Sequence, residues 1–268
     1  MSITLFRKDN FEGDCHAVSG DIADLKDTPV KHAASSMRMT SAADSVLLFK
    51  NKNYNGDVMF RSGVTEISKL SSPSKGGKVG FGDVVASARR TPFTVNLFVN
   101  IVAKDDGSFP GFPDMPAFIA DTVAVANSIW NKFFIQLEVG EVVTRESSSM
   151  HDMKWELYPL LWKNWQKARH ANVYYVGSLH KAFGVCPPVG WGQGAVVECG
   201  AAPNVARAGD TLAHELGHYF GISSHEEDVL NLMTKASDIS AGIMTDQQVE
   251  EVHKTLTKHV GRTSLRNE

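Results

Sequence analysis

The residues with the clearest chemical potential are two histidines four positions apart, with a glutamate directly after the first: His214, Glu215 and His218. On an α-helix, residues four apart lie on one face, so both imidazoles can reach one metal ion. Zinc takes histidine nitrogens at about 2.0–2.1 Å, and a catalytic zinc keeps one position for water. Glu215 can accept a proton from that water, whose pKa the metal lowers. The pattern therefore predicts a hydrolytic zinc site.

A third ligand is expected from the chain just beyond this helix. Gly221 can adopt the positive φ that ends a helix, because glycine has no Cβ, and the resulting turn would bring His225 back to the metal. The alternative third ligand is one of the acidic residues that follow, Glu226, Glu227 or Asp228. An imidazole completes the set without added negative charge, which favours His225.

With Asn231-Leu232-Met233 after it, this stretch resembles the metzincin zinc endopeptidases, whose pattern is HExxHxxGxxH followed by a Met-turn. The resemblance implies an α+β protease domain that cleaves peptide bonds of a protein or peptide substrate. It also implies roles for five residues: zinc ligands His214, His218 and His225, general base Glu215, and Met233 packed beneath the metal.

The sequence departs from the metzincin pattern at two positions. The third histidine of the pattern would fall at Ser224, whereas the histidine here is one residue later. Lys235 stands where some metzincin subfamilies carry a tyrosine ligand, so a tyrosine at that position is not expected to bind the metal.

A substrate-binding strand is also implied by the resemblance, because in metzincins the edge strand before the zinc helix pairs with the extended substrate. The candidates lie in a glycine-rich run at 190–197, and the predicted substrate-binding residues are Gly192, Gln193, Gly194 and Ala195. The alternative is a glycine-rich edge strand that binds nothing.

The zinc helix needs a start and an apolar side that packs on a core. Asp210 is the expected N-cap, before Thr211. The expected buried face is Leu212, Ala213, Leu216 and Phe220. Other elements predicted for this domain are strands at 95–101, 135–139 and 173–179, a helix after Asp114, a helix at 154–168 bent by Pro159, and a helix from a capping box at Thr245 to about Leu256.

The first 91 residues contain an internal repeat. An aromatic pair with a following glycine, Phe6, Phe11 and Gly13, recurs as Phe49, Tyr54 and Gly56. Two copies of one small unit predict an aromatic-clamped hairpin repeated in an all-β sandwich of two Greek keys, with strands at 3–6, 46–49 and 58–60. This part resembles the βγ-crystallin domains, many of which bind calcium.

The calcium loops of that family would fall at 31–36 and 82–87. Only Ser35 and Asp83 remain there as possible side-chain ligands, so at most one weak calcium site is expected. The alternative is that the serines hydrogen-bond the hairpin turns.

Composition and charge narrow the remaining possibilities. The chain has 268 residues, of which 43% are hydrophobic, and a net charge of −3. No basic stripe indicates nucleic-acid binding, and no apolar run approaches the about 20 residues of a membrane span. The N-terminus has no secretory pattern, so we expect synthesis in the cytoplasm and, where the protein acts outside, export by a leaderless route. The sequence makes no prediction of oligomeric state.

The three cysteines, Cys15, Cys186 and Cys199, are too few for a disulfide scaffold. Cys186 and Cys199 are a candidate pair in an oxidising compartment, and three buried thiols are the alternative.

The sequence thus predicts two domains. Residues 1–91 are expected to form a βγ-crystallin-like Greek-key domain, and residues 92–268 a zinc-dependent endopeptidase domain. The alternative is a non-catalytic binding or structural protein in which zinc only stabilises the second domain.

Overall fold

A computed structural model divides the chain into two compact units, Met1–Phe93 with Thr245–Glu268, and Thr94–Met244. It describes residues 3–70, 85–168, 170–180, 182–186, 194–200, 203–235 and 241–259. The sequence placed all residues after 91 in the second domain. The C-terminal segment instead belongs to the first unit, because its helix packs on a strand there. Among the described residues, no helix is long and apolar enough to cross a membrane.

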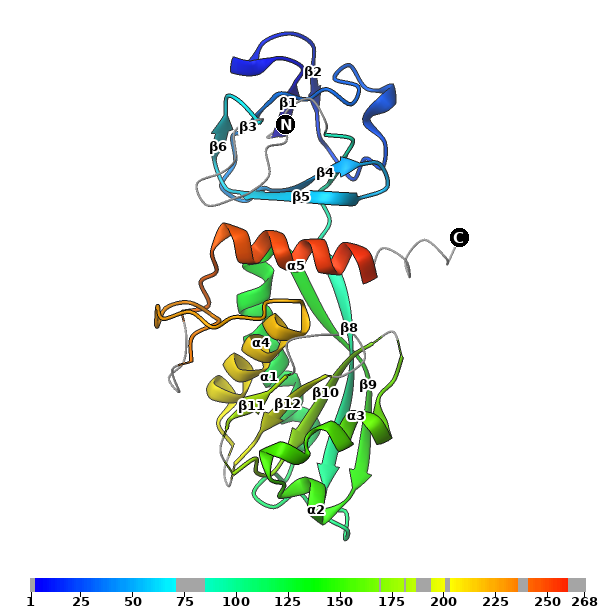
Figure 1. The fold of residues 1–268 in the computed structure, drawn as a ribbon, viewed down its shortest axis with the longest axis vertical. Helices are drawn as coiled ribbons and strands as arrows, with labels where there is room; N and C mark the ends of the chain where they lie inside the picture. Colours follow the sequence, from blue (N-terminus) through cyan, green and yellow to red (C-terminus); the bar gives the residue numbers. More distant parts are fainter. Residues whose placement is uncertain are drawn as a thin grey trace. The chain divides into compact units, whose positions relative to one another are not determined.

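Two antiparallel sheets form the first unit (Figure 1). One has the order β2-β1-β3-β6, with strands β1 (Ile3–Phe6), β2 (Cys15–Ala17), β3 (Ser36–Met39) and β6 (Thr65–Ile67). The other has the order β5-β4-β7, with strands β4 (Ser45–Asn51), β5 (Asn55–Ser62) and β7 (Ser87–Arg89). Short 3₁₀ helices occupy Asp9–Phe11 and Leu25–Asp27. Leu5, Met37, Leu48 and Met59 are among the residues of one core cluster, to which both sheets contribute.

The predicted repeat is realised as two matching hairpins. The rings of Phe6 and Phe11 meet edge to face at 5.7 Å, and those of Phe49 and Tyr54 at 5.8 Å. Gly13 and Gly56 both have positive φ, 76° and 85°, which explains why a glycine follows each aromatic pair.

A serine from a neighbouring strand closes each hairpin. The Ser36 hydroxyl donates to the Lys8 carbonyl (2.6 Å) and accepts from the Phe11 amide (3.0 Å). The Ser87 hydroxyl donates to the Asn51 carbonyl (2.7 Å) and accepts from the Tyr54 amide (3.1 Å). Each serine thus uses its donor and an acceptor within the turn.

The second unit is built on a five-stranded sheet of order β11-β12-β10-β8-β9. Its strands are β8 (Phe93–Ala103), β9 (Ile135–Glu146), β10 (Ala171–Val176), β11 (Gly184–Val185) and β12 (Ala195–Glu198). Strand β10 runs parallel to β8 and β12, while β11 is antiparallel to β12.

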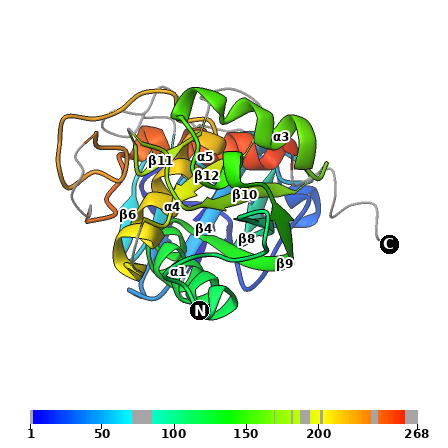
Figure 2. The same cartoon turned by 90° about the horizontal axis from the view of Figure 1, so that it is seen from below.

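Helices lie on both faces of this sheet, α1 (Met115–Trp130) on one and α3 (Pro159–Trp165) on the other (Figure 2). The Tyr175 hydroxyl meets the Thr122 hydroxyl of α1 at 2.7 Å. The preceding Tyr174 faces the opposite way and packs in a cluster with Leu161 and Trp162 of α3. Helix α4 (Val205–Tyr219) packs against α1 and β12. The short helix α2 spans Ser148–His151.

Most predicted elements occur in the structure, and one differs in form. Asp114 caps α1 by accepting the Ala117 amide at 2.9 Å, as predicted. The stretch at 154–168 is not one bent helix. It contains a 3₁₀ turn, Trp155–Leu157, and then α3, whose first residue is Pro159. Proline is favoured in a first helical turn, so Pro159 starts a helix here instead of bending one.

Candidate metal centre

Helix α4 carries the first two histidines and starts earlier than predicted. Its N-cap is Asn204, whose side chain accepts the Arg207 amide at 3.0 Å. The prediction of Asp210 as N-cap was therefore wrong: Asp210 lies inside the helix and is buried. The predicted apolar face is confirmed, since Leu212, Ala213, Leu216 and Phe220 are all fully buried.

The end of α4 is shaped by Gly221, as predicted. Its φ is 109°, and its amide donates to the His218 carbonyl at 3.0 Å. The Ile222 amide donates to the Gly217 carbonyl at 3.1 Å. These two bonds form a Schellman motif, which stops the helix and reverses the chain.

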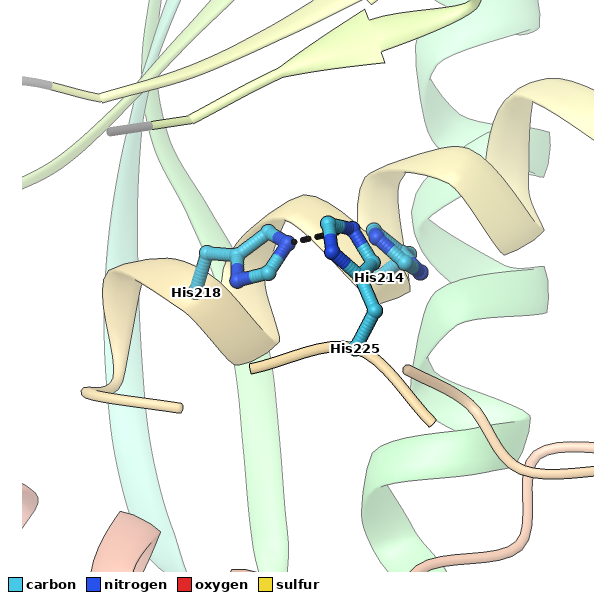
Figure 3. A group of neighbouring side chains, drawn as sticks. All are labelled: His214, His218 and His225. Carbon is cyan, nitrogen blue, oxygen red and sulfur yellow. Dashed lines mark hydrogen bonds between the residues drawn. The ribbon is translucent and has the colours of Figure 1, made fainter. Parts of the chain in front are cut away.

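The reversed chain brings His225 to the two helical histidines. One ring nitrogen of each of His214, His218 and His225 lies within 4.8 Å of the others, and Figure 3 shows the rings turned towards one another. Nε2 of His218 and Nε2 of His225 are 3.2 Å apart. Two nitrogens bound at about 2.0–2.1 Å to one tetrahedral ion would be roughly 3.3 Å apart. Among the described residues, these three form the only such cluster, and the acidic alternatives at 226–228 are not part of it.

Backbone carbonyls orient both helical histidines. Nδ1 of His214 is 2.7 Å from the Leu232 carbonyl, and Nδ1 of His218 is 2.7 Å from the Ile222 carbonyl. A carbonyl only accepts, so each Nδ1 carries the hydrogen and each Nε2 keeps its lone pair. Such bonds fix the tautomer and ring orientation of histidine ligands.

Burial also keeps these imidazoles neutral. It lowers the pKa of His214 and lowers that of His218 to about 4. The pKa of His225 is lowered by burial and by the nearby Lys235 ammonium. Neutral nitrogens with converging lone pairs are what zinc requires, so the residues present fit this metal.

Met233 lies directly beneath the ligand helix. It is fully buried, and a Cβ added to Gly217 would meet its sulfur at 2.4 Å. The Asn231 side chain accepts the Met233 amide at 2.8 Å, and the Glu226 amide donates to the Met233 carbonyl at 2.8 Å. One turn therefore supports His214 through the Leu232 carbonyl and also ties down the segment that carries His225. Sequence reasoning gave Asn231 no role of its own.

Glu215 lies beneath strand β11 and is almost fully buried, with 6% of its surface exposed. Burial raises its pKa to about 8, and a hydrogen bond from the Cys186 amide opposes that rise. A Cβ added to Gly184 would come within 2.7 Å of Oε1 of Glu215. A glycine at 184 is thus required for β11 to pass this close to the carboxyl group. The sequence gave no signal for this strand, because only two residues of it pair.

The predicted substrate-binding residues are only partly described. Gly194 and Ala195 are described, whereas Gly192 and Gln193 lie outside the described residues. The prediction of an edge strand there was wrong. Val196 of β12 pairs with Val185 of β11 on one side and Tyr174 of β10 on the other. The edge of the sheet beside Glu215 is β11.

The three cysteines are free thiols, and Cys186 and Cys199 are both buried. The register excludes the candidate pair as the chain stands. Val185 lies opposite Val196, so Cys186 comes opposite Ala195, four residues from Cys199. Four residues of strand span roughly 13 Å, and a disulfide needs its Cα atoms within about 7 Å.

Of the possible calcium ligands, only Ser35 is described, and Asp83 lies outside the described residues. The Ser35 side chain is buried, and its hydroxyl donates to the Arg7 carbonyl at 3.0 Å. The Ser35 hydroxyl therefore stabilises the first hairpin.

Comparison with known families supports the identity of the first unit. The sequence model of the Beta/Gamma crystallin family matches residues 2–72. The N-terminal part of the chain is therefore a βγ-crystallin domain, as its sequence suggested. The match ends at residue 72, so the second unit is assigned no family by it.

Solved structures resemble part of the chain at low identity. A βγ-crystallin from Ciona intestinalis is 18% identical, with a TM-score of 0.29, and the match covers 34% of this chain and 100% of that one. A structure on the evolution of the eye lens βγ-crystallin domain fold is 19% identical, with a TM-score of 0.29, over 33% and 82%. The N-terminal domain of protein S is 18% identical, with a TM-score of 0.27, over 33% and 93%. Comparison with curated proteins found no match.

Proposed function

We propose that this protein is a zinc-dependent endopeptidase of the metzincin type. The observation that carries the proposal is the convergence of His214, His218 and His225, whose ligand atoms lie within 4.8 Å of one another. Three neutral nitrogens leave one position of a tetrahedral zinc for water, which distinguishes a catalytic site from a closed structural one. When bound, zinc would polarise a peptide carbonyl and lower the pKa of the attacking water.

The chain's own residues would move the proton. Glu215 follows the first ligand on α4, where its carboxylate can act as a general base. It would accept the proton of the attacking water and pass it to the nitrogen of the departing amine. The Cys186 amide, which donates to this carboxyl group, would hold it in place during both transfers.

An extended substrate would bind along β11. Among the described residues, this two-residue strand pairs on one side only, with β12, and it lies over Glu215. Backbone groups on a free strand edge can pair with an added peptide strand. The substrate edge proposed here is therefore Gly184–Val185, in place of the run at 192–195.

Glu215→Gln tests the mechanism, with Glu227→Gln as the matched control because Glu227 is exposed and lies beside the ligand segment. Glu215→Gln should keep one zinc per chain and lose at least about 10²-fold in cleavage of a denatured protein, as expected when a general base is removed. Glu227→Gln should match the unaltered chain in both assays. Full activity in Glu215→Gln would disprove the proposed mechanism.

The second candidate is a non-catalytic protein in which the crystallin domain acts and zinc stabilises the other unit. The family match covers residues 2–72 only, so it supports the presence of the crystallin domain in this candidate and leaves its role to experiment. X-ray absorption at the zinc edge separates the two. Four protein ligands together with no cleavage would favour a structural zinc, whereas three nitrogens and a water oxygen would favour the peptidase.

A further inference from the structure

The first unit, Met1–Phe93 with Thr245–Glu268, is called the crystallin unit below. Its strand β4 is buried on both faces. Val46, Leu47, Leu48 and Phe49 are each fully buried, although side chains alternate between the two faces of a strand. Val46 and Leu48 belong to the core between the two sheets. Leu47 and Phe49 therefore point to the outer face. Their partners on the neighbouring strand β5 are Phe60 and Val58, respectively. A sandwich by itself would leave such an outer face open to water.

The C-terminal helix α5 (Asp246–His259) packs along β5 (Figure 1). Val249, Val252 and Leu256 are buried at the spacing of one helical face. His253, fully buried, lies with its ring 5.5 Å from that of Phe60 and 5.6 Å from that of Phe93. The helix starts with a capping box, in which the Thr245 amide donates to the Gln248 side chain and the Gln248 amide donates to the Thr245 hydroxyl.

We propose that the outer face of β4 and β5 is a helix-binding surface whose occupant is α5, and that residues 1–93 and 245–259 fold as one cooperative unit. Residues 94–244, which hold the histidine cluster, are then an insertion in that unit. The contact of Phe93 with His253 places the start of the insertion against the helix that follows it. Lys254 adds a charged contact to the apolar one, since its ammonium is 3.6 Å from the Asp57 carboxylate.

The packing of α5 on β5 requires neither zinc nor peptidase activity. Helix α5 then contributes to the stability of the crystallin unit as well as lying in it. Damage to α5 should therefore loosen β4 and β5 and leave α1 and α4 as they were. A helix that belonged to the metal-binding unit would do the reverse.

Hydrogen exchange of the full chain tests this, with Val252→Asp as the main variant and Gln247→Asp as the control, because Gln247 is exposed on the same helix. A carboxylate buried at 252 should speed exchange of the β4 and β5 amides by about a hundredfold or more, since an unpaired buried charge is strongly unfavourable. The amides of α1 and α4 should keep their rates, and Gln247→Asp should change neither set.

Val252→Ala covers the case in which Val252→Asp aggregates, since loss of two methyl groups should give a smaller change in the same amides. A peptide of residues 245–259 added to Val252→Asp should restore slow exchange in β4 and β5, and the same peptide carrying Val252→Asp should not. The proposal is overturned where β4 and β5 keep their rates in both variants, or where α1 and α4 change in their place.

Discussion

The hairpins of the crystallin unit and the histidine cluster of the second unit position polar side chains in the same way, but with different outcomes. Ser36 and Ser87 each donate to one backbone carbonyl and accept from one backbone amide. His214 and His218 also use backbone carbonyls, yet each keeps a second nitrogen whose lone pair points to a shared space. The serine hydroxyls make all their described hydrogen bonds within the hairpins, whereas the histidines are oriented by such bonds and keep a nitrogen lone pair available. Lone pairs that converge in this way can bind a shared ligand.

His218→Ala should have the largest effect, because it removes one converging lone pair. Zinc affinities correspond to about 10–16 kcal/mol shared among three or four ligands, so the loss of one should weaken binding by at least about 10³-fold. Competition with a chromogenic chelator measures this. His151→Ala is the matched control, since His151 is a buried histidine of the same unit outside the cluster. Equal zinc affinity in His218→Ala and the unaltered chain would show that the cluster does not hold the metal.

Asn231→Leu should have the next largest effect, because it removes the acceptor that shapes the turn under His214. Its side chain holds the Met233 amide at 2.8 Å, and the carbonyl of the residue between them orients His214. Loss of such outer support costs about 10–100-fold in metal affinity. Asn231→Asp keeps the acceptor oxygen and should lose less. The absorption spectrum of cobalt bound in place of zinc reports whether the ligand geometry has changed, and an unchanged spectrum in Asn231→Leu would contradict the role of Asn231.

The histidine cluster and the two hairpins could be predicted from sequence, because their signals are local. Histidines four apart, a glycine after the helix and a repeated aromatic pair each depend on a few neighbouring residues. The supports could not be predicted, because they come from backbone groups that fold from a distance. The carbonyls of Leu232 and Ile222 and the amide of Cys186 have no residue type to reveal them.

Two other features needed tertiary information. Strand β11 has two residues, too few for an alternating pattern, so the sequence alone makes β12 the expected edge strand. Aspartate and asparagine both cap helices well, so the local sequence does not choose between Asp210 and Asn204. Only the structure shows that α4 starts after Asn204.

Ser87→Ala should leave the metal centre unchanged and destabilise the crystallin unit. The substitution removes the hydroxyl that hydrogen-bonds both the Asn51 carbonyl and the Tyr54 amide. Leaving buried backbone groups without this partner costs about 1–3 kcal/mol of stability. Ser36→Ala should cost a similar amount, because its two bonds match those of Ser87. Hydrogen exchange of the β4 and β5 amides at increasing urea concentrations, with the exposed Ser62→Ala as control, measures the change. A shift in zinc affinity in either variant would contradict the independence of the two regions.

Ser35→Ala should have the smallest effect. It tests whether the Ser35 hydroxyl only supports the hairpin or can also bind calcium. The Ser35 hydroxyl donates to the Arg7 carbonyl at 3.0 Å, so its loss should cost about 1 kcal/mol of stability. Its oxygen is used by the hairpin, so any rise in melting temperature on addition of calcium should be equal in the variant and the unaltered chain. A calcium response that is present in the unaltered chain and disappears in Ser35→Ala would instead make Ser35 a ligand. The crystallin unit would then contain an oxygen that binds a metal, and Ser35 would resemble the histidines of the cluster more than Ser36 and Ser87.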